Sequence, residues 1–279
     1  MSFAEYEGRS ETRLDIVWPE RIRGLAATLD MAEDAVAPGG VLPPLWHWML
    51  FQDWVPGAGL GTDGHPKRGG FLPPVHDLPR RMWAGGRLEF HAPLRAGQPV
   101  SRTSTILKVD EKQGGSGRLV FVTVGHVIAG PDGVAVTEEH DIVYRGTEGA
   151  AVKAAPLAAP PPEGAFGYAV DPGPVMLFRY SALTGNGHRI HYDLDYVTRE
   201  EGYSGLIVHG PLQATLMIDL IRRHRPGARL ARFAFRGRRP AFHQNRLALW
   251  GWAEADGAIH LESRDADGAI CMDGQAVLA

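Results

Sequence analysis

The chain has 279 residues, of which 44% are hydrophobic and 22% charged, and its formal net charge is −3. This balance is typical of a globular protein with one large domain or two ordinary ones, and it gives no reason to expect a nucleic-acid partner. The single cysteine, Cys271, excludes an intramolecular disulfide and a cysteine-based metal cluster. Neither a signal peptide nor an apolar run of the roughly 20 residues that cross a bilayer is evident. We therefore expect a cytoplasmic protein without a membrane partner.

The first half of the chain carries helical patterns and then strand patterns. Pro19 can open a helix whose apolar face would comprise Ile22, Leu25, Ala26 and Leu29. A second, apolar helix is expected from Pro44, in the stretch PLWHWMLFQDW. After a Gly-rich loop, four segments alternate apolar and polar residues and are separated by turn sequences, as antiparallel strands are. These segments are residues 86–92, 101–109, 117–129 and 134–144.

Residues 146–174 are rich in Ala, Pro and Gly and are interpreted as a linker. The second half begins with FRYSALTGN and continues with a helix from Gly210, which is apolar on nearly every side and is therefore expected to be buried. Four further strands are expected after that helix. They cover residues 228–236, 245–254, 258–263 and 269–278.

The same order of elements thus occurs twice. A long apolar helix wrapped by an antiparallel sheet is the hotdog arrangement, so we expect an α+β double hotdog, with one half at 1–145 and the other at 175–279. Aligning the halves places AATLD (26–30) on ALTGN (182–186), and Asp30 on Asn186. Five residues later the first half has Ala35 where the second has His191. We therefore expect one active site, in the second half.

The stretch ALTGNGHRIHYD, followed by VHGPLQATLM, resembles the hydratase motif of the MaoC-like dehydratases, the (R)-specific enoyl-thioester hydratases. The stretches DGHPKRGGFLPP and RRMWAGGRLEF resemble a double-hotdog subgroup of that family. Its members include hydratases of mesaconyl-C4-CoA and of itaconyl-CoA and the hydroxyacyl-thioester dehydratases type 2. The resemblance covers most of the chain outside the linker. It implies a hydro-lyase that hydrates an enoyl-CoA reversibly, most simply a short branched dicarboxylic one giving a citramalyl-CoA.

The chemistry of hydration assigns roles to three residues of the motif. His191, with an ordinary pKa of about 6.5, suits the base that deprotonates water and the acid that protonates the α-carbon. Asn186 can hold the same water by its amide. Gly210 lies at a helix start, where free N–H groups favour an enolate oxyanion. Many family members carry Asp at the position of Asn186, and because an amide is no base, His191 would be the sole proton carrier unless Asp193 is recruited.

Several other residues are candidates for contact with the substrate. Lys67 and Arg68 could meet coenzyme A phosphates or a substrate carboxylate, or could be solvated loop charges. The guanidinium groups after the strand at 228–236 could grip phosphate, or could simply protect a sheet edge; they are Arg236, Arg238 and Arg239. His209 is expected either to cap or pack the helix or to contact the substrate, and His188 is expected at a solvent-facing loop position.

A metal centre is not expected, since the hydration needs no Lewis acid and the spacings in HRIH and HYD lack a second ligand cluster. No cofactor is expected beyond the coenzyme A of the acyl-CoA substrate. Ser181 lacks the G-x-S-x-G elbow of a serine hydrolase. Two alternative functions remain: a dehydratase of long-chain 3-hydroxyacyl thioesters, and a non-catalytic acyl-CoA-binding module. A homodimer is compatible with either.

Overall fold

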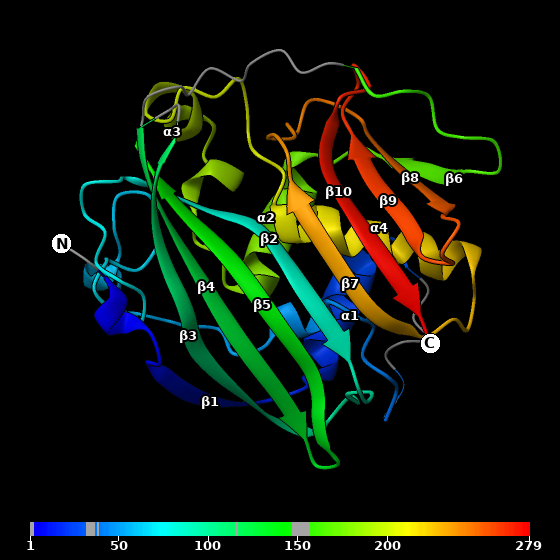
Figure 1. The fold of residues 1–279 in the computed structure, drawn as a ribbon, viewed down its shortest axis with the longest axis horizontal. Helices are drawn as coiled ribbons and strands as arrows, with labels where there is room; N and C mark the ends of the chain where they lie inside the picture. Colours follow the sequence, from blue (N-terminus) through cyan, green and yellow to red (C-terminus); the bar gives the residue numbers. More distant parts are fainter. Residues whose placement is uncertain (1–2, 32–36, 38, 115–116, 147–156) are drawn as a thin grey trace.

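The computed structural model describes residues 3–31, 37, 39–114, 117–146 and 157–279. In this part of the chain ten strands form one sheet in the order β1-β3-β4-β5-β2-β7-β10-β9-β8-β6, and all paired neighbours are antiparallel (Figure 1). The strands of the first half are β1 (Ser10–Ile16), β2 (Arg80–Phe90), β3 (Pro99–Gly114), β4 (Gly117–Gly130) and β5 (Gly133–Arg145). Those of the second half are β6 (Phe166–Val170), β7 (Leu230–Gly237), β8 (Leu247–Ala253), β9 (Ile259–Arg264) and β10 (Ile270–Leu278).

The two halves meet at β2 and β7, which pair from Gly85 opposite Arg236 to Glu89 opposite Arg232. Outward from this junction both halves repeat one order of strands, and each ends at its own first strand, β1 or β6. The backbones approach closely at the junction: a Cβ at Gly85 would lie 2.5 Å from the carbonyl oxygen of Phe235. The two halves therefore share one continuous sheet.

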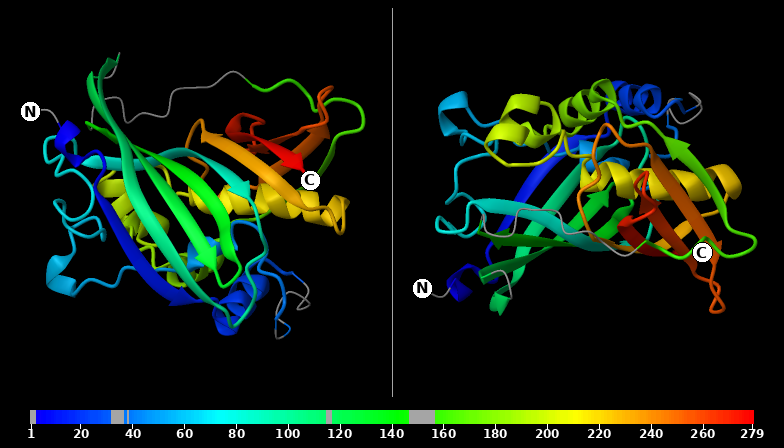
Figure 2. Two further views of the ribbon diagram at one scale, coloured as in Figure 1. Left: turned by 60° about the horizontal axis from the view of Figure 1, so that its bottom comes forward. Right: turned by 90° about the horizontal axis from the view of Figure 1, so that it is seen from above.

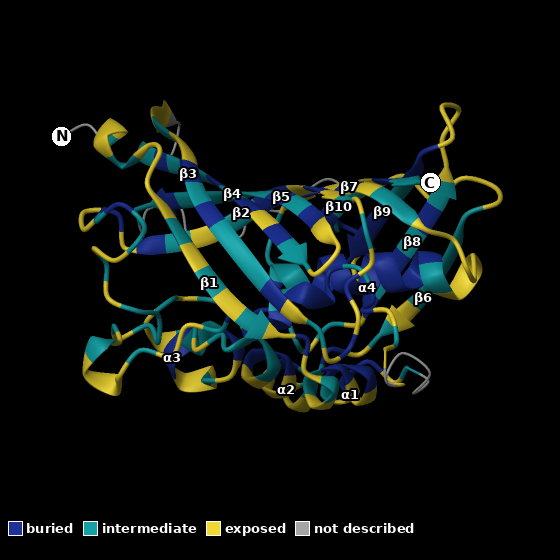
Figure 3. Cartoon of the chain, turned by 90° about the horizontal axis from the view of Figure 1, so that it is seen from below, coloured by how far each residue is buried: buried dark blue, intermediate teal, exposed yellow. Residues whose placement is uncertain are grey.

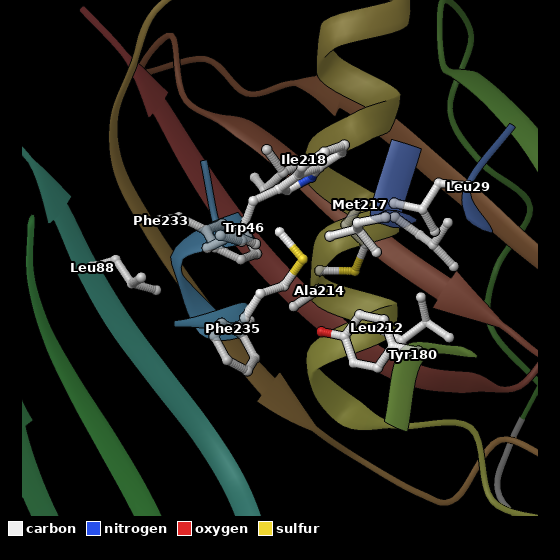
Figure 4. Close-up of a cluster of buried hydrophobic side chains, with 14 of the residues drawn as sticks. Leu29, Trp46, Leu88, Tyr180, Leu212, Ala214, Met217, Ile218, Phe233 and Phe235 are labelled. Atoms are coloured by element: carbon white, nitrogen blue, oxygen red, sulfur yellow. The ribbon is translucent and has the colours of Figure 1, made fainter. Parts of the chain in front are cut away.

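The helix α4 (Gly210–His224) forms the centre of the core. Every residue from 212 to 221 is buried, because the helix lies between the sheet and a second layer of helices (Figure 3). Its Ala214, Met217 and Ile218 lie among side chains from other parts of the chain, including Trp46 and Phe235 (Figure 4). The all-round apolar sequence therefore predicted both this helix and its burial correctly.

Two helices cover α4 on the side away from the sheet (Figures 2 and 3). They are α1 (Pro19–Thr28) and α2 (Pro174–Thr184), each with a proline in its first turn. They pack closely, since a Cβ at Gly24 would lie 2.8 Å from a methyl carbon of Leu183. The C-terminus of α2 leads directly into the hydratase-like motif, so this packing positions the candidate site.

The apolar helix expected from Pro44 is wrong. Only a 3₁₀ turn, Trp46–Met49, forms there. The flanking residues Leu45 and Phe51 have φ of 71° and 58°, a left-handed conformation that cannot continue a right-handed helix. The turn lets His47 Nε2 and Trp48 Nε1 both reach the buried carboxylate of Glu138, each at 3.0 Å. In the described residues the first half thus has no counterpart of α4.

The linker expected at 146–174 also needs correction, because β6 lies inside it and pairs with β8 at the sheet edge. Phe166, Tyr168 and Val170 pack against the core at alternate positions, while Gly167 and Ala169 between them made the strand resemble linker composition. Residues 147–156 of the expected linker lie outside the described residues.

Two further elements were not expected: the edge strand β1, which pairs with β3, and the short helix α3 (Leu194–Arg199). In addition, the part of the chain that is described contains no helix that is both long and apolar enough to cross a bilayer.

Candidate active site

His191 ends a 3₁₀ turn, Arg189–His191, within the hydratase-like motif, and its side chain is buried. Its Nδ1 lies 2.8 Å from the carbonyl oxygen of Ile207. A carbonyl only accepts, so this contact places the proton of the neutral ring on Nδ1 and leaves the lone pair on Nε2. Burial lowers the pKa of His191 to about 4, although the bond to Ile207 acts against this. His191 is therefore a neutral base at physiological pH.

Asn186 lies just beyond the end of α2, where Gly185 adopts the left-handed conformation that closes the helix. Its backbone N–H donates to the Ser181 carbonyl at 2.9 Å, and its Oδ1 accepts from the His188 N–H at 3.0 Å. The second bond fixes the orientation of the amide and leaves its Nδ2 hydrogens to donate to another group.

His209 is completely buried and packs flat on His191, with ring centroids 3.6 Å apart. Its Nε2 lies 2.8 Å from Ser181 Oγ, and it makes no side-chain cap of α4. Among the described atoms no hydrogen-bond partner reaches its Nδ1. Of the two expectations for His209, the structure therefore favours packing, in a position that supports the ring of His191.

Gly210 begins α4, and Pro211 follows it at the first turn. The N–H groups at a helix start have no partner within the helix, and in the described part of the chain no backbone carbonyl accepts from that of Gly210, so it can bind a ligand. A Cβ at Gly210 would meet only Met272 Cε, at an ordinary 3.7 Å. Packing within the protein therefore does not require glycine here, and its absence of a side chain leaves room in front of the helix start.

The expected solvent-facing position of His188 is wrong, because its ring is partly buried between two other histidines. Its centroid lies 4.1 Å from that of His65 and 5.6 Å from that of His191. Burial, and then the neighbouring His65 and His191, lower the pKa of His188 to about 2. His65 is in turn held by Asp63, whose Oδ2 lies 3.1 Å from His65 Nδ1.

Asp63 and His65 come from the Gly-rich loop of the first half, and sequence reasoning missed them. The loop reaches the motif because both backbones are glycine where they touch: a Cβ at Gly64 would overlap the Gly187 carbonyl, and one at Gly187 would lie 2.7 Å from the Gly64 oxygen. The Arg189 N–H also donates to the Asp63 carbonyl at 2.9 Å. The Asp-Gly-His turn within DGHPKRGG is the sequence feature that could have indicated Asp63 and His65; the expectations above concern only Lys67 and Arg68 of this stretch.

Asp193 has a structural role. Its Oδ1 accepts from the Tyr196 N–H at 3.0 Å and so caps α3, while its Oδ2 lies 2.7 Å from Arg189 Nη2. The hydrogen bond from Tyr196 and the ion pair with Arg189 keep the pKa of this carboxyl below its ordinary value. The structure therefore gives no sign that Asp193 is a second base.

Of the arginines after β7, two are already neutralised. Arg238 forms a bidentate pair with Asp273 at 2.8 and 2.6 Å, and Arg239 lies 3.5 Å from Asp265. Arg236 is exposed on β7. By contrast, Lys67 and Arg68 bond to neutral backbone carbonyls and line a pocket of about 1030 Å³, whose wall also includes Asp63 and His65.

Among the described residues, two groups of side chains bring metal-ligand atoms within 4.8 Å of one another. They are Asp63 with His65 and His188, and His126 with Glu138 and His140. In both groups the carboxylate is already engaged, by His65 in the first and by His47, Trp48 and His140 in the second. Each carboxylate thus already has partners within the protein. The residues of HRIH and HYD do not form a ligand cluster, because the Asp193 carboxylate caps α3 instead.

The corresponding positions of the first half do not reproduce this arrangement. Asp30, the counterpart of Asn186, is exposed and follows the end of α1. Ala35, the counterpart of His191, lies outside the described residues.

Residues 45–243 match the model of a family described as hydroxyacyl-thioester dehydratase type 2. Over 274 residues, 97% of this chain and 96% of the relative, the sequence is 44% identical to a Chloroflexus aurantiacus protein named mesaconyl-C(4)-CoA hydratase. It is 28% identical to the mitochondrial hydroxyacyl-thioester dehydratase type 2 of Schizosaccharomyces pombe, over 75% of this chain and 77% of the relative.

Solved structures share the fold at low sequence identity. A MaoC-like dehydratase from Phytophthora capsici matches with a TM-score of 0.71 and 17% identity, over 98% of this chain and 96% of the other. A Mycobacterium tuberculosis protein described as having a double hotdog fold matches with a TM-score of 0.62 and 12% identity, over 98% and 96%. These likenesses confirm the expected double hotdog fold. The family model and the 44% identical relative confirm the expected resemblance to the hydroxyacyl-thioester dehydratases type 2 and to a mesaconyl-C4-CoA hydratase.

Proposed function

Because the chain belongs to the hydroxyacyl-thioester dehydratase type 2 family, we propose that it hydrates an enoyl-CoA thioester reversibly. The preferred acyl group is short, branched and dicarboxylic, as in mesaconyl-C4-CoA or itaconyl-CoA, and the product is a citramalyl-CoA. The observation that carries the proposal is the state of His191: a buried, neutral imidazole whose Nδ1 is held by Ile207 and whose Nε2 makes no hydrogen bond to a described residue.

In the proposed reaction His191 Nε2 takes a proton from water while the water oxygen forms a bond to the β-carbon. The electrons of the C=C bond move to the α-carbon and the thioester oxygen. The protonated His191 then gives its proton to the α-carbon, so that one water is added across the double bond. All proton movement passes through one side chain, and we propose that no cofactor takes part beyond the coenzyme A of the substrate.

Two further residues would complete this site. Asn186 would donate from Nδ2 to the attacking water, since its Oδ1 accepts from His188. The free N–H at Gly210 would stabilise the negative charge that develops on the thioester oxygen, with the α4 dipole adding to the effect. The stacked His209 would keep the His191 ring in place.

One observation supports the dicarboxylic acyl group. The higher identity is to the protein named mesaconyl-C(4)-CoA hydratase, 44% against 28% for the S. pombe relative. Because the chain is also similar to the S. pombe hydroxyacyl-thioester dehydratase, a long-chain 3-hydroxyacyl thioester is the alternative substrate.

The test is a hydration assay with mesaconyl-C4-CoA, crotonyl-CoA and a long-chain 2-enoyl-CoA, following loss of the enoyl-thioester absorbance. We expect turnover to be fastest with mesaconyl-C4-CoA. Faster turnover of the long-chain substrate would favour the alternative. Binding of all three without turnover would indicate the non-catalytic module.

A further inference from the structure

We propose that the pocket beside the candidate site binds the phosphate groups of the substrate's carrier, which rests on the proposed thioester function. The pocket measures about 1030 Å³ and lies between the Gly-rich loop, the start of β2 and the region of α3. Six cations and four carboxylates line it. The cations are Lys67, Arg68, Arg80, Arg81, Arg189 and Arg199. In a chain with a net charge of −3, this is a local concentration of positive charge.

Half of these cations lack an acidic partner. Arg80 pairs with Glu201, Arg189 with Asp193, and Arg199 with Asp195. Within the described residues, no carboxylate forms an ion pair with the other three, which are Lys67, Arg68 and Arg81. Their charges are therefore available to an anion.

The hydrogen bonds of Lys67 and Arg68 hold these side chains without neutralising them. Lys67 Nζ donates to the Ala58 carbonyl at 2.8 Å. Arg68 donates to the carbonyls of Val75 and Pro79, and burial, with Arg81 nearby, lowers its pKa. Two guanidinium groups that repel each other across a partly enclosed space are stabilised when a phosphate binds between them.

Arg80 is a fixed part of the pocket wall. Its side chain is only 9% exposed, its Nη2 donates to the Glu201 carbonyl at 2.8 Å, and its Nε lies 3.3 Å from the Glu201 carboxylate. Arg80 therefore adds positive charge beside the pocket, while Lys67, Arg68 and Arg81 are the groups that would contact a phosphate.

The pocket is also connected to the proposed chemistry. Asp63 and His65 line it, and the ring of His65 contacts that of His188, which in turn contacts His191. In coenzyme A a pantetheine arm separates the phosphates from the thioester. Phosphates held by Lys67 and Arg81 would thus place that arm past His65 toward the start of α4. The neutralised Arg238 and Arg239 offer no comparable site.

The test compares one enoyl group carried on coenzyme A, on 4′-phosphopantetheine and on pantetheine, which has no phosphate. We expect Lys67→Gln and Arg81→Gln to raise KM for the CoA thioester about tenfold, the worth of one charge-assisted bond, with kcat little changed. Neither variant should change KM for the pantetheine thioester. Lys108→Gln, at an exposed lysine of β3, is the matched control and should behave like the unaltered protein.

The 4′-phosphopantetheine thioester distinguishes the sources of phosphate. If it binds as tightly as the CoA thioester, the pocket takes the single phosphate that an acyl-carrier protein would also present. If it binds more weakly, the nucleotide phosphates of coenzyme A are held there. An equal loss with the pantetheine thioester would overturn the proposal, as would a selective loss for CoA in Arg236→Gln but not in Arg81→Gln.

Calorimetric titration of coenzyme A into His191→Ala separates this proposal from the proposed function. Weaker binding when Lys67→Gln or Arg81→Gln is added would support the phosphate pocket even if no substrate is turned over. Unchanged binding in both double variants would contradict it even if hydration is confirmed.

Discussion

The rings of His191 and His209 stack with their planes 18° apart, and the two residues use different ring nitrogens for their hydrogen bonds. His191 is tied through Nδ1 to Ile207, while His209 is tied through Nε2 to Ser181. Burial, together with the neighbouring His191, lowers the pKa of His209 well below its ordinary value. A protonated His191 would therefore face a neutral ring and not a second cation, which allows it to take up and release a proton.

His191→Ala should lower kcat by about 10²- to 10⁴-fold, the usual contribution of one positioned acid–base group. KM should change little, since the thioester would still be held at the start of α4. His260→Ala, at a partly exposed histidine of β9, is the matched control. Near-normal turnover by a folded His191→Ala protein would contradict the mechanism.

Asn186→Ala should reduce kcat less than His191→Ala does, because the amide orients water and transfers no proton. Asn186→Asp places the residue that many family members carry and should maintain or increase kcat. Steady-state hydration rates of both variants give the comparison. A loss in Asn186→Asp as large as that in His191→Ala would show that the amide hydrogens are indispensable.

The pH dependence of kcat/KM should report the lowered pKa of His191. The base is active when neutral, and its pKa in the folded protein is about 4. Activity should therefore persist through the ordinary histidine range and fall only as the pH drops toward 4. Rates at a series of pH values, with circular dichroism to exclude unfolding, provide the measurement. An acidic limb centred near the ordinary value of about 6.5 would contradict this assignment.

Stability should also decrease in acid before the carboxylates titrate. Burial lowers the pKa of His126 to about 3, that of His188 to about 2 and that of His191 to about 4. The unfolded chain binds these protons near pH 6.5, so the free energy of unfolding should fall as the pH drops below that value. The slope should be about 1.4 kcal/mol per pH unit for each such group. Urea unfolding at several pH values tests this. His126→Gln should reduce the slope by about 1.4 kcal/mol per pH unit, the contribution of one proton.

Gly64→Ala should separate the Gly-rich loop from the motif. The residue has φ of +87°, and a Cβ would overlap the Gly187 carbonyl. Gly8→Ala is the control, since Gly8 has φ of +81° with nothing within 4 Å of a Cβ. Both variants should lose about 1–2 kcal/mol from backbone strain. Only Gly64→Ala should lose more and also lose turnover, as Asp63 and His65 move away from His188. Equal effects in the two variants would exclude a role for the contact.

Asp30→Asn should leave turnover unchanged, because Asp30 is the exposed first-half counterpart of Asn186. The hydration assay checks this directly. A clear loss of kcat would mean that the first half contributes more to catalysis than its residues indicate.

The elements that sequence predicted well are those whose side chains are buried in a regular pattern. The all-round apolar stretch from Gly210 could form little else than a buried helix, and the motif from Asn186 to His191 is local. The 3₁₀ turn at Trp46 could not be predicted, because the side chains of His47 and Trp48 bond to Glu138, about 90 residues away in the sequence. Asp63 and His65 were missed for a similar reason: only the tertiary contact of Gly64 with Gly187 makes their loop part of the site.

The pairing of β2 with β7 has a consequence for any separated half of the chain. In the intact protein these strands satisfy each other's backbone groups, and of the described strands only β1 and β6 lie at the edges of the sheet. A fragment containing β6 to β10 would expose the edge of β7 together with part of the apolar surface around α4. Such an edge tends to recruit another strand, so the fragment should self-associate through β7. In the intact chain the first half acts as a covalently attached partner that prevents this.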